Sequence, residues 1–173
     1  MKLEVWAKEL RIPFLSLPVI FVPLGVMVAY FDVATINLLH AILTLIGVVC
    51  LHASVNVLND YFDYKSGIDV ATTPTPFSGG SRVLPEKLLS PNNVLIGGII
   101  LLIIGSSIGL YFLNYFGFNS VLLAIIAISI LSVILYSPVL STLGLGELTV
   151  FLNFGPLLFS GVYFIQSGGN CSN

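Results

Sequence analysis

Long apolar segments alternate with short polar ones along this chain, and five of the apolar segments are long enough to cross a bilayer. A membrane-spanning helix needs about 20 predominantly apolar residues, because its backbone must satisfy its own hydrogen bonds in lipid. The expected spans cover residues 12–31, 36–58, 93–113, 120–136 and 148–165. This pattern predicts an all-α membrane protein with a single transmembrane domain over residues 1–173.

Serine, proline and glycine mark where these helices begin, bend or come close to one another. Ser90 followed by Pro91 is a favourable helix start, because the hydroxyl can cap a free N–H group and proline suits the first helical position. Gly155 and Pro156 are expected to interrupt the fifth span. Bends are also expected at the three prolines of the first span, Pro13, Pro18 and Pro23. Gly105 and Gly109 form a small-xxx-small pattern that lets neighbouring helices approach closely.

Composition agrees with a membrane protein and excludes an ordinary soluble domain. The chain is 57% hydrophobic and 8% charged, with a mean hydropathy of +1.05, whereas soluble domains carry about 25% charged residues. Its six positive charges all precede the first span or lie between the second and third spans, at Lys2, Lys8, Arg11, Lys65, Arg82 and Lys87. The positive-inside rule therefore predicts that both regions face the cytoplasm.

The amino-terminal segment and the cysteines carry weaker signals. Residues 1–10 place Leu3, Trp6 and Leu10 on one side, which indicates a helix lying on the membrane surface. Cys50 lies within an apolar span and Cys171 lies in the last three residues, so a disulfide between them is not expected. Cys50 is interpreted as a small apolar interior residue.

Polar residues gather where the second span ends. His52, Asn56, Asn59 and Asp63 are spaced at i, i+4, i+7 and i+11, which places them along one stripe of a helix. An ionisable group at membrane depth is a candidate functional group. His52 on its own is more typical of a hydrogen-bonded interior histidine than of a catalyst.

Oxygen ligands in this region suggest a divalent cation. Asp60 is one position further round the helix, and Asp69 follows Gly67, a natural helix stop. Without thiols or paired histidines, such a set favours Mg²⁺, which is commonly held by one or two carboxylates together with substrate phosphates. The candidate metal ligands are Asn59, Asp60, Asp63 and Asp69. The simpler alternative is a solvated helix end without a ligand.

The loop at residues 61–90 adds groups that can bind an anion. Gly79 and Gly80 allow backbone N–H groups to approach phosphate, and Arg82 can donate two hydrogen bonds to phosphate oxygens, although it could instead contact lipid headgroups. An apolar tunnel between the helices would hold a lipid tail. Together these features predict a site for a lipid diphosphate at the cytoplasmic rim.

Several stretches of the sequence resemble a known family. Residues 59–69 read NDYFDYKSGID and resemble the first Asp-rich motif of the UbiA superfamily of membrane prenyltransferases. Residues 75–82, TPFSGGSR, are similar to the segment that follows this motif in the menaquinone branch. Three further stretches resemble the middle region of that branch, at residues 144–148 (GLGEL), 154–157 (FGPL) and 163–168 (YFIQSG). The resemblance covers residues 11–168, nearly the whole chain.

This resemblance implies a bundle that has about nine transmembrane helices when complete, in a prokaryotic cell membrane. It also implies Mg²⁺-dependent transfer of a polyprenyl group from its diphosphate to an aromatic acceptor, which in the menaquinone branch is 1,4-dihydroxy-2-naphthoate. By position in the motif, Asn59, Asp63 and Asp69 match the diphosphate–Mg²⁺ residues. Substrate contacts are expected from Asp60, Asn56, Lys65, Arg82 and Tyr136.

One feature departs from the family pattern. Members carry a second Asp-rich motif in later helices, whereas the acids after Asp69 are only Glu86 and Glu147. We therefore expect this chain to be the amino-terminal part of a prenyltransferase, lacking about four helices, and to bind a metal-diphosphate poorly on its own. Alternative hypotheses are a small cation-binding transporter or channel subunit, and a prenyltransferase acting on another acceptor.

Overall fold

Every element of the computed structural model is helical within the residues that it describes, 2–71 and 80–169. Gly79 and Cys171 lie outside these ranges. The elements, in chain order, are α1 (Lys2–Glu9), the 3₁₀ turn η1 (Ile12–Leu15), α2 (Ser16–Val33), α3 (Leu38–Ser66), α4 (Ile68–Ala71), α5 (Pro91–Tyr115), α6 (Ser120–Leu135), the π-helical turn η2 (Tyr136–Leu140), α7 (Gly146–Leu152), the π-helical turn η3 (Asn153–Leu157) and α8 (Leu158–Gln166).

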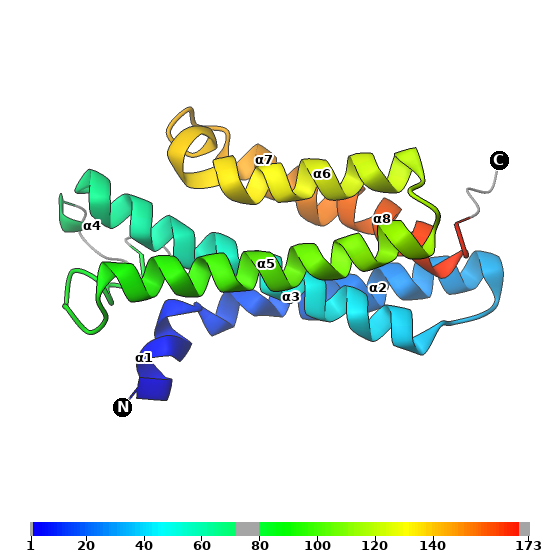
Figure 1. Ribbon diagram of the computed structural model, residues 1–173, viewed down its shortest axis with the longest axis horizontal. Helices are drawn as coiled ribbons and strands as arrows, with labels where there is room; N and C mark the ends of the chain where they lie inside the picture. Colours follow the sequence, from blue (N-terminus) through cyan, green and yellow to red (C-terminus); the bar gives the residue numbers. More distant parts are fainter. Residues whose placement is uncertain (1, 72–79, 170–173) are drawn as a thin grey trace.

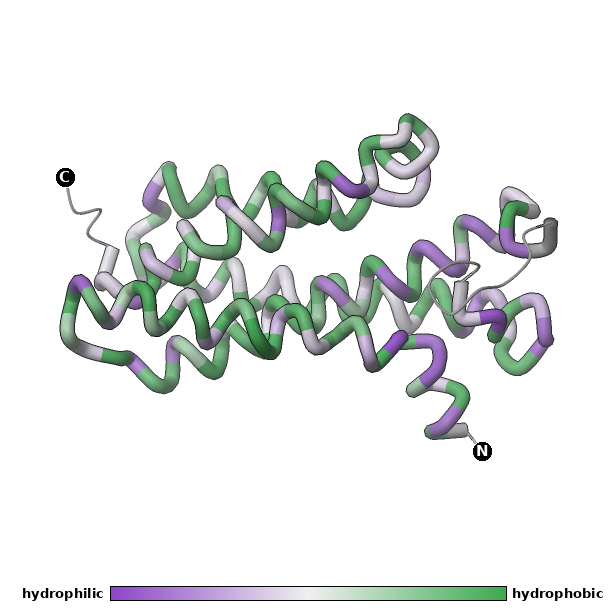
Figure 2. Tube along the Cα trace, turned by 180° about the vertical axis from the view of Figure 1, so that it is seen from behind, coloured by the Kyte–Doolittle hydropathy of each residue, from purple (hydrophilic) through white to green (hydrophobic). Residues whose placement is uncertain are grey.

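The long helices run side by side along one axis, with α1 and α4 at one end of the bundle (Figure 1). Among the described residues, five segments are long and apolar enough to cross a membrane, which confirms the predicted spans: Ile12–Val33, Leu38–Ser66, Pro91–Tyr115, Ser120–Leu140 and Gly146–Gln166. Hydrophobic residues cover the middle of the bundle, and hydrophilic residues gather toward the end that carries α1 (Figure 2). On α5, Ile96, Ile100 and Ile103 form an exposed apolar stripe suited to lipid.

Helix boundaries follow the local signals in the sequence. Ser90 Oγ accepts a hydrogen bond from the Asn93 backbone N–H at 3.3 Å, and Pro91 is the first residue of α5. Gly67 ends α3 in the left-handed conformation, at φ +82°. Helix α3 continues to Ser66, so residues 61–66, which the sequence placed in the polar loop, are helical.

The predicted interruption of the fifth span is confirmed. Gly155 has non-helical dihedral angles of φ −92° and ψ −107°, and with Pro156 it forms the turn η3 between α7 and α8. In the first span, Pro13 lies in η1 and Pro23 lies inside α2. Irregular turns therefore occur at Pro13, Gly155 and Pro156. By contrast, α2 continues as one helix through Pro18 and Pro23, where the predicted bends stay a prediction.

Glycines bring α3 and α5 into close contact. A Cβ atom on Gly105 would come within 2.7 Å of the Leu51 side chain and 3.0 Å of the Gly47 carbonyl oxygen. The neighbouring glycine of the pattern, Gly109, faces Ile126 of α6 at 3.1 Å. The small-xxx-small spacing therefore serves helix packing, as the sequence predicted.

Helix α1 packs onto the end of the bundle. The Trp6 ring lies against Gly97 of α5, where a Cβ atom would come within 2.7 Å of it. Leu10 packs against a buried cluster that contains Val57 and Val94. Only Leu3 of the three expected surface-facing residues is largely exposed, so the apolar side of α1 packs in part against the bundle, and its contact with the membrane surface stays a prediction.

At the opposite end, the α2–α3 connection is joined to α8. The backbone N–H of Asn37 donates to Gln166 Oε1 at 2.9 Å, and Gln166 Nε2 donates to the Asn37 carbonyl oxygen at 3.2 Å. His40 is buried beside these residues, with its ring edge-on to the Tyr115 ring at a centroid distance of 4.7 Å. These contacts hold the helices together at the end of the bundle opposite to the Asp-rich motif.

Candidate functional site

Helix α3 places Asn59 and Asp63 on successive turns, because it remains regular through Ser66. Asn59 Nδ2 donates a hydrogen bond to Asp63 Oδ2 at 2.9 Å. The guanidinium of Arg11, at the start of the first span, donates to Asn59 Oδ1 at 3.2 Å. The amide and the carboxylate predicted to share one helical stripe therefore contact each other, and an arginine 48 residues earlier in the chain joins them.

Asp60 holds the surrounding segments together. It forms an ion pair with Arg11 through Oδ1 and accepts a hydrogen bond from the Ser81 backbone N–H at 2.9 Å through Oδ2. Only 1% of Asp60 is exposed. Because both carboxylate oxygens already have protein partners, Asp60 anchors the first span and the loop around Ser81 to α3 in this arrangement.

Glu9 is completely buried next to this ion pair. Its Oε2 accepts a hydrogen bond from Ser81 Oγ at 2.8 Å, whereas Oε1 has no partner among the described residues. Burial, together with the negative charge of Asp60, raises the pKa of Glu9 to about 7. The end of α1 therefore places a carboxyl group that can gain or lose a proton near neutral pH beside the acidic motif.

Asp69 lies in the first turn of α4, against the loop that returns toward α5. Gly80 faces it so closely that a Cβ atom at residue 80 would come within 2.7 Å of Asp69 Oδ2. Asp69 is 3% exposed, and Oδ2 has no hydrogen-bond partner within residues 2–71 and 80–169. Burial, and next the charge of Asp60, raise the pKa of Asp69 to about 6. This buried, unpartnered oxygen is the donor that best fits a cation.

Two arginines approach the acids from left-handed backbone positions. Arg11 has φ +51° and Arg82 has φ +65°. The Arg82 guanidinium donates to the backbone carbonyl oxygen of Asp69. Left-handed conformations are uncommon for residues with a Cβ atom, and such strain often occurs at functional sites. With these backbone conformations, the Arg11 guanidinium contacts Asn59 and Asp60, and the Arg82 guanidinium contacts Asp69.

The side-chain oxygens at this site fit a hard cation that takes its remaining ligands from water or from a bound molecule. Asn59, Asp63 and Asp69 offer amide and carboxylate oxygens, which Mg²⁺ prefers. No three His, Cys, Asp or Glu residues in the described part of the chain are arranged to hold a metal by themselves. A cation held by two carboxylates would therefore take its remaining ligands from water or from phosphate oxygens.

The other residues named from the sequence have separate surroundings. Asn56 Nδ2 donates to the Leu10 carbonyl oxygen at 3.2 Å and so holds the end of α1. Lys65 Nζ lies 5.9 Å from the centre of the Tyr61 ring. Tyr136 begins the turn η2, which packs against α3. Their expected contacts with substrate remain predictions.

Three residues of the site were missed from the sequence: Glu9, Arg11 and Ser81. Arg11 and Ser81 contact Asp60 from 49 and 21 positions away along the chain, and Glu9 accepts its hydrogen bond from Ser81, 72 positions away. Arg11 and Glu9 served only as charges in the sequence interpretation, because a pattern along one helix does not show which distant segment packs against it. The positive charge of Arg11 just before the first span was the one available signal.

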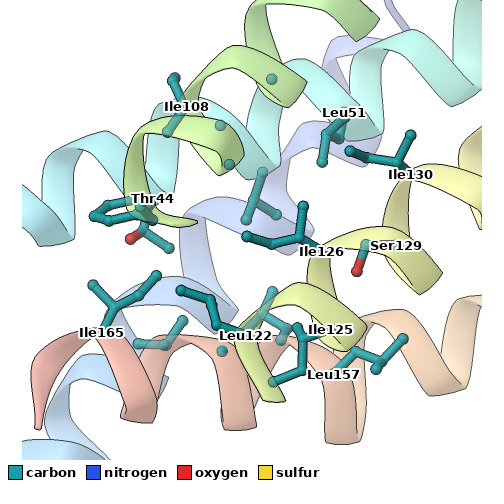
Figure 3. Close-up of a pocket in the computed structure, with 18 residues that line it drawn as sticks. Thr44, Leu51, Ile108, Leu122, Ile125, Ile126, Ser129, Ile130, Leu157 and Ile165 are labelled. Carbon is teal, nitrogen blue, oxygen red and sulfur yellow. The ribbon is translucent and has the colours of Figure 1, made fainter. Parts of the chain in front are cut away.

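An apolar cavity of about 110 Å³ lies deeper in the bundle, between α3, α5, α6 and α8 (Figure 3). On α3 it is lined by Thr44, Gly47, Val48 and Leu51, which precede the acidic motif on the same helix. Ser129 of α6 is one of its few polar lining residues (Figure 3). The sequence predicted an apolar tunnel for a lipid tail between the helices, and binding of a tail in this cavity stays a prediction.

Comparison with known proteins gives one family. The UbiA prenyltransferase family model matches residues 17–171. UbiA prenyltransferase domain-containing protein 1 of Xenopus tropicalis is 26% identical over 171 residues, which cover 96% of this chain and 48% of that protein. The 2-carboxy-1,4-naphthoquinone phytyltransferase of Synechocystis sp. is 29% identical over 176 residues, covering 95% of this chain and 52% of that protein.

The human UbiA prenyltransferase domain-containing protein 1 is 30% identical over 128 residues, which cover 71% of this chain and 36% of that protein. The chain thus spans about half the length, or less, of these curated relatives. No solved structure matches it. Glu9 and Arg11 precede the segment that the family model matches.

Proposed function

This chain belongs to the UbiA prenyltransferase family, and we propose that it binds a polyprenyl diphosphate with Mg²⁺ for transfer of the prenyl group to an aromatic acceptor. One observation carries the proposal. A single helix, α3, presents oxygen donors at one end and lines the apolar cavity further along. A lipid diphosphate has the same division between a charged head and an apolar tail.

The spacing along α3 suits such a ligand. Asn59 and Leu51 are eight residues apart, which corresponds to about 12 Å along a helix. The diphosphate would lie beside Asn59, Asp63 and Asp69, with its tail directed toward Leu51 and the cavity. Arg82 and the backbone at Gly80 lie next to Asp69, where they can contact phosphate oxygens.

The residues of the site bind and position the substrate, and none has to act as a nucleophile. Cleavage of the allylic C–O bond gives the diphosphate an electron pair and leaves a delocalised cation, which the electron-rich ring of the acceptor attacks. Bound Mg²⁺ would stabilise the charge that develops on the leaving group. The apolar walls around Leu51 would keep water from capturing the cation.

We propose 1,4-dihydroxy-2-naphthoate, as in menaquinone biosynthesis, as the acceptor. Support comes from the motifs at residues 59–69 and 75–82, which resemble the menaquinone branch, and from the relative named as a naphthoquinone phytyltransferase. Transfer to a different ring by the same chemistry is the alternative. An assay offering naphthoate and benzoate acceptors side by side separates the two.

We also propose that the acidic end and α1 face the cytoplasm of a prokaryotic cell. Positive charges, which favour the cytoplasmic side, precede the first span or lie between the second and third spans. They are Lys8, Arg11, Lys65, Arg82 and Lys87. Prenyl diphosphates and Mg²⁺ are supplied from this compartment, so the proposed orientation and the proposed substrate agree.

The structure favours this proposal over a channel subunit. Acids that line a cation pore must face water. Asp60 and Asp69 are 1% and 3% exposed, and Asp60 is paired with Arg11. This burial is more typical of a closed binding site.

The proposal is tested by calorimetric titration of the chain in lipid nanodiscs with geranyl diphosphate, with and without Mg²⁺. We expect weak, Mg²⁺-dependent binding that Asp63→Asn abolishes. The matched control is Glu86→Gln, which removes an exposed acid at the same end that pairs with Lys8. Equal heats with and without Mg²⁺, or equal loss in both variants, would overturn the proposal.

A further inference from the structure

His52 has an unused hydrogen-bond acceptor inside the bundle. It lies on α3 seven residues before Asn59, which places it about 10 Å deeper along the helix than the proposed head-group site. Its Nε2 atom is buried and has no hydrogen-bond partner in the part of the chain that the structure describes. A buried polar atom without a partner is unfavourable, so a ligand that bonds to it would gain affinity.

The opposite side of the imidazole fixes which nitrogen carries the proton. The imidazole lies within hydrogen-bonding reach of the Phe14 backbone in η1. Because Nε2 has no partner among the described residues, we assign this contact to Nδ1, which then donates to the Phe14 carbonyl oxygen. A neutral imidazole with its proton on Nδ1 has a lone pair on Nε2. Nε2 is therefore available to accept a hydrogen bond from a hydroxyl group.

The neighbours of His52 suit an aromatic ring. The Phe154 ring lies edge-on to the imidazole at a centroid distance of 5.0 Å, and Phe21 lies 6.1 Å from Phe154. Phe154 belongs to the π-helical turn η3, in which Gly155 is non-helical and a Cβ atom added to Gly155 would meet no described atom within 4 Å. Because the helix is already broken here, Phe154 can shift without breaking regular helical hydrogen bonds.

We propose that His52 binds the aromatic acceptor, with Nε2 accepting a hydrogen bond from a ring hydroxyl and Phe154 and Phe21 packing against the ring. This inference rests on the proposed prenyl transfer. The location fits, because along the axis of α3 His52 lies between Asn59 and the cavity-lining Leu51, which is its neighbour in the chain. An acceptor bound there would meet the allylic carbon where the head and tail of the diphosphate join.

The same contact accounts for the proton in the transfer. As the allylic C–O bond breaks, diphosphate leaves with the electron pair, and a ring carbon of the acceptor forms the new bond to the allylic carbon. The ring hydroxyl then loses its proton to Nε2 of His52, giving an imidazolium and a ring ketone. The hydrogen on the alkylated ring carbon then leaves as a proton to the departed diphosphate, and the imidazolium returns its proton to the ring oxygen, which restores the aromatic ring and neutral His52.

The test compares two probes that differ only at the hydroxyl, 1-naphthol and 1-methoxynaphthalene, titrated into the chain in nanodiscs. One hydrogen bond in a dry site should favour 1-naphthol about tenfold in the wild-type chain. Both probes also partition into lipid, so the decisive quantity is how far this preference changes between the wild-type chain and His52→Phe. We expect His52→Phe to lose the preference and His52→Gln, which keeps an acceptor oxygen, to retain part of it.

The matched control is His40→Phe, which replaces the buried histidine at the other end of the bundle and should leave the preference unchanged. A wild-type chain that binds both probes equally would overturn the assignment without reference to any variant. So would a preference that survives His52→Phe. If the naphthol preference is present but geranyl diphosphate shows no Mg²⁺ dependence, the proposed prenyl transfer fails while the hydroxyl contact of His52 stands.

Discussion

The carboxylate of Asp69 lies directly against the α-carbon of Gly80, so that a methyl group on residue 80 would come within 2.7 Å of Asp69 Oδ2. Gly80 also has φ +71°, a conformation that residues with side chains rarely adopt. The loop and α4 are therefore fitted to each other through a glycine, and the position of the Asp69 oxygen depends on it.

Gly80→Ala should weaken Mg²⁺-dependent binding of geranyl diphosphate by at least about tenfold, because the new methyl group displaces the Asp69 carboxylate. The control is Gly67→Ala, which has a similar φ of +82° but no atom within 4 Å of a Cβ position among the described residues. Both variants should lose about 1 kcal/mol of stability from the left-handed conformation. Equal affinity in the two variants would show that Asp69 does not contribute to binding.

The ion pair between Arg11 and Asp60 should be important for stability. Arg11→Gln or Asp60→Asn alone is expected to lower the free energy of unfolding by about 3 kcal/mol, because each leaves a partly or fully buried charge without its partner. The double variant should lose less than the sum of the two. Denaturant unfolding in detergent measures all three.

Lys8→Ala is the control for this pair. Lys8 and Glu86 form an ion pair at 3.0 Å, but both side chains are nearly half exposed. Exposed pairs contribute about 0–1 kcal/mol, so this variant should unfold almost as the wild type does. If the double variant of Arg11 and Asp60 loses as much unfolding free energy as the two single variants together, this would contradict the direct ion pair seen in the structure.

Burial of Glu9 should make the protein less stable as the pH rises. Its pKa is raised from 4.5 to about 7 in the folded chain, so the folded state binds the proton more tightly than the unfolded state does. Stability should therefore be greatest below pH 4.5 with respect to this group, and should fall between pH 4.5 and 7 by up to about 3 kcal/mol.

Glu9→Gln tests this dependence, because glutamine stays neutral and can still accept the hydrogen bond from Ser81. Thermal unfolding between pH 5 and 8, with chelator present, should show a smaller decline in the variant and a higher melting temperature than wild type at pH 8. Part of the decline should remain, because the pKa of Asp69 is also raised, from 3.8 to about 6. A pH profile identical to wild type would contradict a buried, titrating Glu9.

The cavity should set how long a prenyl tail is bound. Ser129→Phe places a ring in the space that Ser129 now lines (Figure 3). Affinity for geranylgeranyl diphosphate should fall about tenfold, equivalent to losing burial of roughly two methylene groups, while dimethylallyl diphosphate should bind unchanged. The control is Ser107→Phe, at an exposed serine on α5 whose hydroxyl donates to the Ile103 carbonyl oxygen of the same helix. A loss common to both tail lengths would argue against tail binding in this cavity.

Sequence reasoning was most successful where the controlling residues are neighbours in the chain. The Ser90–Pro91 start, the stop at Gly67 and the break at Gly155 each depend on local dihedral preferences and local hydrogen bonds. Apolar length determined the five spans in the same way. The end of α3 was less clear, because polar residues after Leu58 can equally belong to a loop or to a helix that leaves the membrane.

The contacts of the site could not be predicted from these local signals. The Asp-rich pattern indicated which residues carry oxygen donors, but it did not indicate that Asp60 pairs with Arg11 and Ser81. A metal contact of Asp60 stays a prediction. Whether a carboxylate is free or already paired depends on which distant segments pack beside it. Glu9 was likewise expected on a surface helix and is instead buried.

The central claim is that a cation joins the acidic residues of α3 to a diphosphate. Electron–nuclear double resonance measures this link directly, with Mn²⁺ replacing Mg²⁺ and geranyl diphosphate supplying the phosphorus nuclei. We predict a ³¹P coupling to Mn²⁺ in the wild-type chain that persists in Glu86→Gln and disappears in Asp63→Asn. A Mn²⁺ signal without ³¹P coupling in the wild-type chain, or a coupling unchanged in Asp63→Asn, would contradict the account.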